Sequence, residues 1–205
     1  MWLLKVIEFC LGRLFYKRRG YDDQCLFNSN AFLKHPKPSI TITSPDCGGS
    51  GAQFTNHYSM FGVGQIPTLT WSSPSPADIK QYILVIEDPD GPLGHPNVHG
   101  IYCLIPPSST SVSAIDLELL KEEDGKKIIK SGWRVGKNSR DTVYVPPRPP
   151  RGHGPHRYFF EIIALGEKLK PGKLTDVPTK EELAGAIDGK VVAWGLWVGV
   201  YESVM

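Results

Sequence analysis

The sequence predicts a mainly β fold with many turns, formed by one domain. Its 205 residues include 18 prolines and 21 glycines, which interrupt the chain too often for long helices over most of its length. Between these breaks lie short apolar runs rich in β-branched and aromatic residues, a composition typical of buried strands. A chain of this length is sufficient for one well-buried core.

Composition argues against several functional classes. Hydrophobic residues make up 40% and charged residues 21% of the chain, close to ordinary globular values and unlike a membrane protein. The formal net charge of +2 gives no reason to expect a nucleic-acid partner. The four cysteines have no CxxC spacing, so we interpret them as free thiols of a cytoplasmic protein rather than as a metal site or a disulfide framework.

The first nineteen residues have the pattern of an amphipathic helix, and residues 20–205 form the single domain that follows it. Apolar residues recur at helical spacing, among them Leu3, Ile7, Leu11 and Leu14. The apolar run is too interrupted by charge for a signal peptide, whereas a mitochondrial presequence stays open. We expect the helix to pack on the domain or on a second copy as a homodimer; weak contact with a membrane surface is the alternative.

Strand candidates follow one another along the rest of the chain, and each is bounded by turn residues. They cover residues 39–44, 67–71, 81–86, 98–105, 127–135, 142–145, 156–165 and 191–201. The run 156–165 is nearly all apolar, as expected for a central strand covered on both faces. Residues 178–188 form a predicted helix, since Thr179 and Glu182 have the spacing of a capping box and Gly189 follows as a stop signal.

Titratable side chains gather in two loops. The first set is Asp88, Asp90 and His99, and the second is His153, His156 and Tyr158. Loops held between buried strands present their side chains in fixed positions. If the two strand ends lie side by side, these groups surround one small polar pocket.

Three kinds of chemistry fit such a pocket. A metal site could use histidine and aspartate ligands, but the spacing matches no standard zinc pattern, and we expect neither a metal nor a cofactor. A hydrolase or lyase could use a histidine base, yet neither loop holds a serine or cysteine nucleophile. An anion site could use the backbone N–H groups of Gly152 and Gly154, the imidazoles and the Tyr158 hydroxyl, with the carboxylates fixing the histidine tautomers.

The two loops resemble signature regions of a known family. DPDGP followed by VHGIYCLIP, and later PPRGHGPHRYFFEIIAL, are similar to the two motifs of the phosphatidylethanolamine-binding proteins, which include the Raf kinase inhibitor proteins. The segments PTLTW, GKNS and GVYE extend the resemblance from about residue 40 to residue 202. The N-terminal helix together with GHGPHRYFF is similar to fungal members.

The resemblance implies a β-sandwich or barrel of two antiparallel sheets, with a few peripheral helices and a pocket for phosphate, acetate or a phosphorylated head group. The ligand-binding residues that it implies are Asp88, Asp90, Pro92, His99, Gly152, Gly154, His156 and Tyr158. It implies a soluble binding protein that regulates a partner such as a kinase or a serine carboxypeptidase; a hydrolase or lyase is the alternative. Gly100 departs from the family pattern, which commonly has an aromatic residue there, so one wall of the pocket is expected to be altered.

Overall fold

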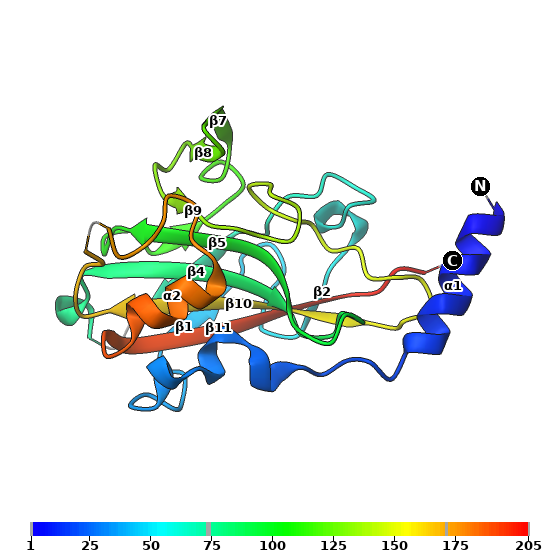
Figure 1. Cartoon of the computed structure of the whole chain (residues 1–205), viewed down its shortest axis with the longest axis horizontal. Helices are drawn as coiled ribbons and strands as arrows, with labels where there is room; N and C mark the ends of the chain where they lie inside the picture. Colours follow the sequence, from blue (N-terminus) through cyan, green and yellow to red (C-terminus); the bar gives the residue numbers. More distant parts are fainter. Residues whose placement is uncertain (1, 73–74, 171, 205) are drawn as a thin grey trace.

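Two sheets of unequal size form the body of the protein in this computed structural model, which describes residues 2–72, 75–170 and 172–204 (Figure 1). The larger sheet has the strand order β2-β11-β10-β4-β5-β9-β8-β7, and the smaller has the order β1-β3-β6. The mainly β class and the two sheets predicted from the sequence are therefore confirmed.

The strands of the smaller sheet are β1 (Thr41–Thr43), β3 (Leu69–Ser72) and β6 (Ser111–Val112). Those of the larger sheet are β2 (Ala52–Gln53), β4 (Gln81–Asp88), β5 (Asn97–Ile105), β7 (Leu119–Glu123), β8 (Lys126–Ile129), β9 (Arg134–Val135), β10 (His156–Leu165) and β11 (Val191–Tyr201). The helices are α1 (Trp2–Phe15), α2 (Lys180–Ile187) and the short 3₁₀ turns η1 (Asp22–Gln24), η2 (Leu26–Asn28), η3 (Asn30–Phe32), η4 (Asn56–Tyr58) and η5 (Pro76–Asp78).

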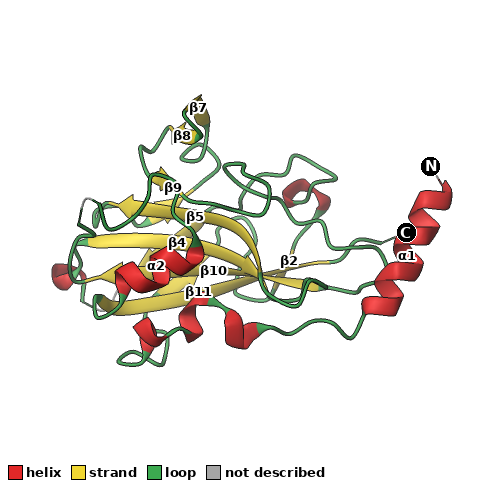
Figure 2. Ribbon diagram, in the orientation of Figure 1, coloured by secondary structure: helices red, strands yellow, loops and turns green. Residues whose placement is uncertain are grey.

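Strand β10 lies at the centre of the larger sheet, between β4 and β11, and pairs antiparallel with both. Alternate side chains of β10 enter two different cores. Phe160 and Ile162 join the core that faces the smaller sheet. Ile163 and Leu165 join a second core, which α2 and the turns η1 to η3 cover on the opposite face (Figure 2). Burial on both faces explains why the sequence of this strand is almost continuously apolar.

Helix α2 and strand β11 confirm two sequence predictions. The Thr179 hydroxyl accepts a hydrogen bond from the backbone N–H of Glu182, and the Glu182 carboxylate accepts one from the backbone of Thr179, which completes the predicted capping box. Strand β11 covers the predicted range.

The prediction of a strand over residues 142–145 is wrong. Here the chain is irregular, and only Val145 pairs with β5, donating its backbone N–H to the His99 carbonyl. The next two residues, Pro146 and Pro147, have no N–H to donate, so a ladder cannot continue.

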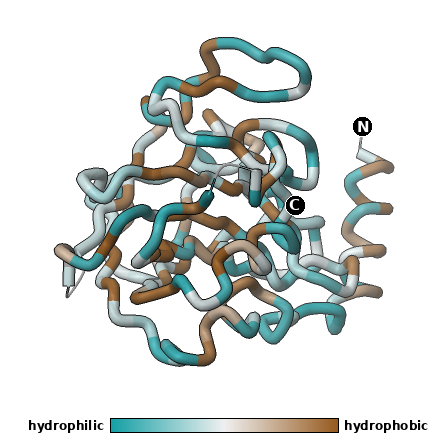
Figure 3. The backbone as a smooth tube through the Cα atoms, turned by 60° about the vertical axis from the view of Figure 1, so that its left-hand side comes forward, coloured by the Kyte–Doolittle hydropathy of each residue, from teal (hydrophilic) through white to brown (hydrophobic). Residues whose placement is uncertain are grey.

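Helix α1 stands at one end of the larger sheet (Figure 1). It ends at Phe15, earlier than predicted. The expectation that its apolar face packs on the domain is not met, since Leu4, Leu11 and Leu14 are 70%, 49% and 72% exposed; the apolar side of the helix is visible in Figure 3. No helix in the described part of the chain has the length and apolar character needed to cross a membrane.

Candidate anion-binding pocket

A pocket of about 250 Å³ opens where β4 ends and where β5 and β10 begin. Phe159 pairs with Glu87, and Asn97 pairs with Asp88, so the three strand ends are adjacent. Five of the predicted site residues line the pocket, namely Asp88, Pro92, His99, His156 and Tyr158. Side chains that the motifs did not assign to the site complete its polar lining: His95, Asn97, Ser139, Arg140 and Arg148.

Asp88 and His156 form a buried pair at the base of the pocket. The Oδ2 atom of Asp88 lies 2.8 Å from Nδ1 of His156, and the two side chains are 6% and 1% exposed. The second Asp88 oxygen accepts a hydrogen bond from the backbone N–H of Asp90. Asp88 therefore fixes the orientation of the His156 ring, as expected for a carboxylate that supports a histidine.

A second histidine extends this pair into a chain of hydrogen bonds. Nε2 of His156 lies 2.7 Å from Nδ1 of His153, whose Nε2 lies 2.9 Å from the Phe15 carbonyl oxygen at the end of α1. The carbonyl can only accept, so Nε2 of His153 carries a proton. One proton must also lie between the rings and another between His156 and Asp88.

The two rings and Asp88 together thus hold one proton more than two neutral imidazoles and a carboxylate would hold. Burial, followed by the neighbouring His156, lowers the pKa of His153. The extra proton therefore lies in the hydrogen bond between Nδ1 of His156 and Oδ2 of Asp88. A charge-neutral arrangement of this kind is compatible with the deep burial of all three side chains.

His99 is a neutral histidine with both ring nitrogens bonded. Its Nδ1 donates to the Val145 carbonyl over 2.5 Å, and its Nε2 accepts from the Asn97 amide over 2.9 Å. Burial lowers the pKa of His99, which agrees with the neutral tautomer that these bonds require. The sequence prediction gave the imidazoles the role of anion donors, but every ring nitrogen of His99 and His156 is already paired with the protein.

Tyr158 supplies the donor that the histidines do not. Its hydroxyl is buried and has no hydrogen-bond partner among the described residues, although it belongs to the pocket lining. Burial raises the pKa of Tyr158 well above its ordinary value, so the group stays an O–H donor at neutral pH. A buried hydroxyl without a partner carries a desolvation cost that a ligand oxygen would remove.

The rim of the pocket carries positive charge from two arginines. Arg140 and Arg148 both line it; the Glu8 carboxylate lies 3.6 Å from Arg148 and 2.8 Å from Arg151. Two guanidinium groups thus share one carboxylate, while Arg140 has no carboxylate within ion-pair distance among the described residues. The positive charge of the arginines therefore exceeds the negative charge paired with it, and this excess favours an anion in the pocket.

Comparison with known proteins identifies the family. The family profile described as Phosphatidylethanolamine-binding protein matches residues 44–202. The chain belongs to the phosphatidylethanolamine-binding protein family. A solved homologue of this family from Chlamydia trachomatis superposes with a TM-score of 0.65 at 28% identity, covering 82% of this chain and 99% of the homologue.

Two fungal relatives match nearly the whole chain. A protein named Phomoidride biosynthesis cluster protein B, from a fungal species, is 59% identical over 98% of this chain and 96% of its own length. The protein of the same name from Talaromyces stipitatus is 53% identical over 99% of this chain and 84% of its own length. The chain is thus a fungal-type member of the phosphatidylethanolamine-binding protein family, as the sequence predicts.

Asp90, a predicted ligand residue, faces away from the pocket. Its carboxylate accepts hydrogen bonds from the backbone and the guanidinium of Arg157 at 2.9 Å, and Arg157 also forms an ion pair with Asp22. Burial alone would raise the pKa of the Asp90 carboxyl and is the largest single effect on it. The hydrogen bonds and the charge of Arg157 together outweigh burial, so the pKa is lowered. Asp90 and Arg157 together tie the turn after β4 to the chain that leads from α1.

Gly152 and Gly154, also predicted as ligand residues, lie under α1. Their φ angles are +78° and +85°, in the region that favours glycine. A Cβ atom on Gly152 would meet Phe9, and one on Gly154 would meet Tyr16. The glycines of this loop therefore allow the N-terminal segment to approach closely, a role that the sequence did not suggest.

Gly100 accommodates a neighbouring ring. A Cβ atom there would lie 2.8 Å from the hydroxyl of Tyr102, which itself donates to the Val143 carbonyl. The Tyr102 ring thus occupies the space beside Gly100. This is the position at which the family pattern commonly has an aromatic residue and at which we expected an altered pocket wall.

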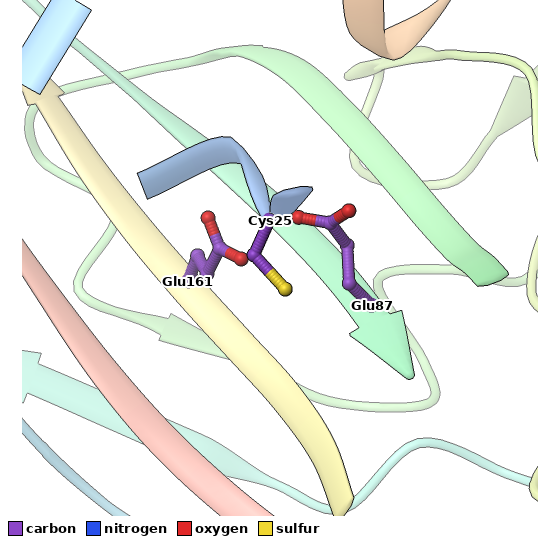
Figure 4. A group of neighbouring side chains, drawn as sticks. All are labelled: Cys25, Glu87 and Glu161. Atoms are coloured by element: carbon purple, nitrogen blue, oxygen red, sulfur yellow. The ribbon is translucent and has the colours of Figure 1, made fainter. Parts of the chain in front are cut away.

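A second buried titratable cluster lies on the face of the larger sheet that α2 and the turns η1 to η3 cover. Its three side chains are drawn in Figure 4. One donor atom from each of Cys25, Glu87 and Glu161 lies within 4.8 Å of the others. Glu87 already accepts from the Lys180 ammonium and the Leu26 N–H, both at 2.7 Å. Burial and the adjacent Glu87 raise the pKa of Glu161 well above its ordinary value. We interpret the pair as a carboxylate beside a neutral carboxyl group, balanced by Lys180.

Proposed function

We propose that this protein binds a small anionic molecule in the pocket and does so as a component of fungal small-molecule biosynthesis. The observation that carries the binding proposal is the buried Tyr158 hydroxyl, which no described residue bonds, in a pocket rimmed by Arg140 and Arg148. A ligand oxygen would accept from the hydroxyl, and the guanidinium groups would stabilise its charge.

The biosynthetic role is supported by the two fungal relatives. Both are named as proteins of a phomoidride biosynthesis cluster, and both match nearly the whole chain. Phosphate, acetate and a phosphorylated head group have the charge and size that suit a pocket of about 250 Å³. Regulation of a partner kinase or serine carboxypeptidase remains a prediction from the family resemblance.

Thermal unfolding in the presence of phosphate or acetate tests the binding proposal. A ligand at one hundred times its dissociation constant adds about 2.7 kcal/mol to the stability of the folded state, so we expect the Tm to rise by several degrees. Chloride at equal ionic strength serves as the control anion. Arg140→Gln is expected to reduce the rise, whereas Arg134→Gln, at a position that lines a different pocket, is expected to keep it. Equal Tm values in phosphate, acetate and chloride would reject the proposal.

A hydrolase or lyase activity is the second candidate, and the hydrogen-bonded array of Asp88, His156 and His153 is the observation that favours it. The array holds a proton at the base of the pocket and could exchange it with a bound substrate. Expression of this chain in Talaromyces stipitatus that lacks its protein B would restore phomoidride formation under this hypothesis, and a folded His156→Gln variant would not. Equal restoration by both forms would exclude proton transfer through His156.

A further inference from the structure

Helix α1 contacts the domain along the edge that carries Glu8, Phe9 and Gly12. Its Gly12 packs so closely on the loop after residue 146 that a Cβ atom would lie 2.0 Å from the Arg151 carbonyl oxygen. Glu8 binds Arg151 at the same edge. The adjacent apolar side chains Leu4, Ile7 and Leu11 remain 70%, 46% and 49% exposed.

These exposed side chains form one wall of a groove of about 510 Å³ between α1 and the domain. Phe15 extends the wall, and Pro92 and Pro150 line the groove from the domain side. From Leu4 to Phe15 the helix rises about 16 Å. The groove is therefore long, concave and mainly apolar, as suits an alkyl chain.

The groove adjoins the anion pocket. Pro92, Arg148 and Pro150 line both the groove and the pocket. Arg148 thus lies at the junction between an apolar surface and a polar one. The Glu8 carboxylate in the groove is paired with Arg151 and Arg148, so it does not present an unpaired negative charge to an apolar occupant.

We propose that the groove binds the apolar tail of the same molecule whose anionic group occupies the pocket, so that the ligand is a single-chain anionic amphiphile. This inference rests on the proposed function of the pocket. The shared lining of the two sites favours this occupant over a second copy of the chain or a bilayer, because a molecule with a charged end and an apolar end fills both sites at once.

Calorimetric titration of the full chain with methyl, butyl and octyl phosphate, below the concentrations at which they form micelles, tests the proposal. Each methylene that enters the groove is expected to strengthen binding about two- to fourfold. The variants Ile7→Ser and Leu11→Ser remove apolar surface from the wall and are expected to abolish the gain for octyl phosphate while leaving methyl phosphate binding unchanged. Leu14→Ser, an exposed position of α1 outside the groove lining, is the matched control and keeps the gain.

The outcomes separate the two proposals. If methyl phosphate binds and chain length has no effect, the groove proposal is overturned and the proposed function of the pocket stands. If none of the three compounds binds, the proposed function itself fails. Loss of binding to phosphatidylcholine vesicles, or loss of a dimer, in Leu11→Ser without any chain-length effect would assign the groove to a membrane or a second copy and would also overturn the proposal.

Discussion

The rings of His153 and His156 share a hydrogen bond of 2.7 Å, with Nδ1 of the first facing Nε2 of the second. Because His153 also donates to the Phe15 carbonyl, this contact joins the C-terminal end of α1 to the Asp88–His156 pair at the base of the pocket. The protonation of the pocket and the docking of the N-terminal helix are therefore physically connected.

The hydrogen-bond pattern predicts that both ring nitrogens of His156 carry a proton. Nitrogen NMR of the imidazole side chains checks this, since protonated and unprotonated ring nitrogens have different chemical shifts. We expect both His156 nitrogens to show N–H signals and Nδ1 of His153 to show none. His153→Phe leaves a buried donor without its acceptor and is expected to cost about 1–3 kcal/mol of stability. A His156 ring with one unprotonated nitrogen in the wild type would refute the proton count.

His99 makes the folded state sensitive to mild acid. Burial lowers its pKa in the folded protein, whereas an unfolded histidine has a pKa of about 6.5. Below that value the unfolded chain binds a proton that the folded ring does not, so stability is lost as pH falls, by up to about 1.4 kcal/mol per pH unit. Urea unfolding from about pH 7 to pH 5 should show a smaller decline for His99→Gln than for the wild type. Parallel declines would contradict the lowered pKa.

Glu161 has the opposite pH dependence. Its raised pKa means that the folded protein keeps a proton that an unfolded glutamate releases above about pH 4.5. Stability therefore falls as pH rises, by up to about 1.4 kcal/mol per pH unit until the folded pKa is passed. Glu161→Gln keeps the shape and removes the titration, so we expect this variant to be the more stable form at about pH 8.

Glu87→Gln is the contrasting variant for the same cluster. It removes the charge that binds Lys180, so we expect it to destabilise the protein at the pH at which Glu161→Gln stabilises it. Unfolding curves of both variants, measured together, check the two signs. A stabilising Glu87→Gln would show that Glu161, rather than Glu87, carries the negative charge.

Gly12 controls the docking of α1. In Gly12→Ala the new methyl group would lie 2.0 Å from the Arg151 carbonyl oxygen, so we expect the helix to detach although alanine favours an isolated helix by about 1 kcal/mol. Hydrogen exchange of residues 2–15 should become faster, while Leu14→Ala, at an exposed position, should leave it unchanged. Unaltered protection in Gly12→Ala would show that the close approach is not required.

The central part of the site could be predicted from the sequence because strand geometry determines it. Asp88 ends a buried strand, and His156 and Tyr158 lie two residues apart at the start of another. Side chains at that spacing share a face, and antiparallel pairing of β4 with β10 places both strand ends together. The motif resemblance then identified the pair of strands.

Other site features depend on contacts between distant segments, which periodicity does not reveal. Asn97 reaches the pocket from the first position of β5 and Arg140 from irregular chain. Asp90 binds Arg157, and its own N–H binds Asp88 inside the turn. The buried Glu161 was part of an apolar run, and its partner Glu87 comes from a different strand. The approach of α1 to Gly152 likewise has no local signal.

The most direct measurement of the central claim compares two tyrosines whose buried hydroxyls have no hydrogen-bond partner in the part of the chain that the structure describes. Tyr158 lines the anion pocket, whereas Tyr144 lines a separate pocket near Leu117. We predict that calorimetry with methyl phosphate gives the same affinity for the wild type and Tyr144→Phe, and an affinity about tenfold to one hundredfold weaker for Tyr158→Phe, since a hydrogen bond to a charged group is lost. Equal affinity of all three forms would contradict the assignment of the pocket.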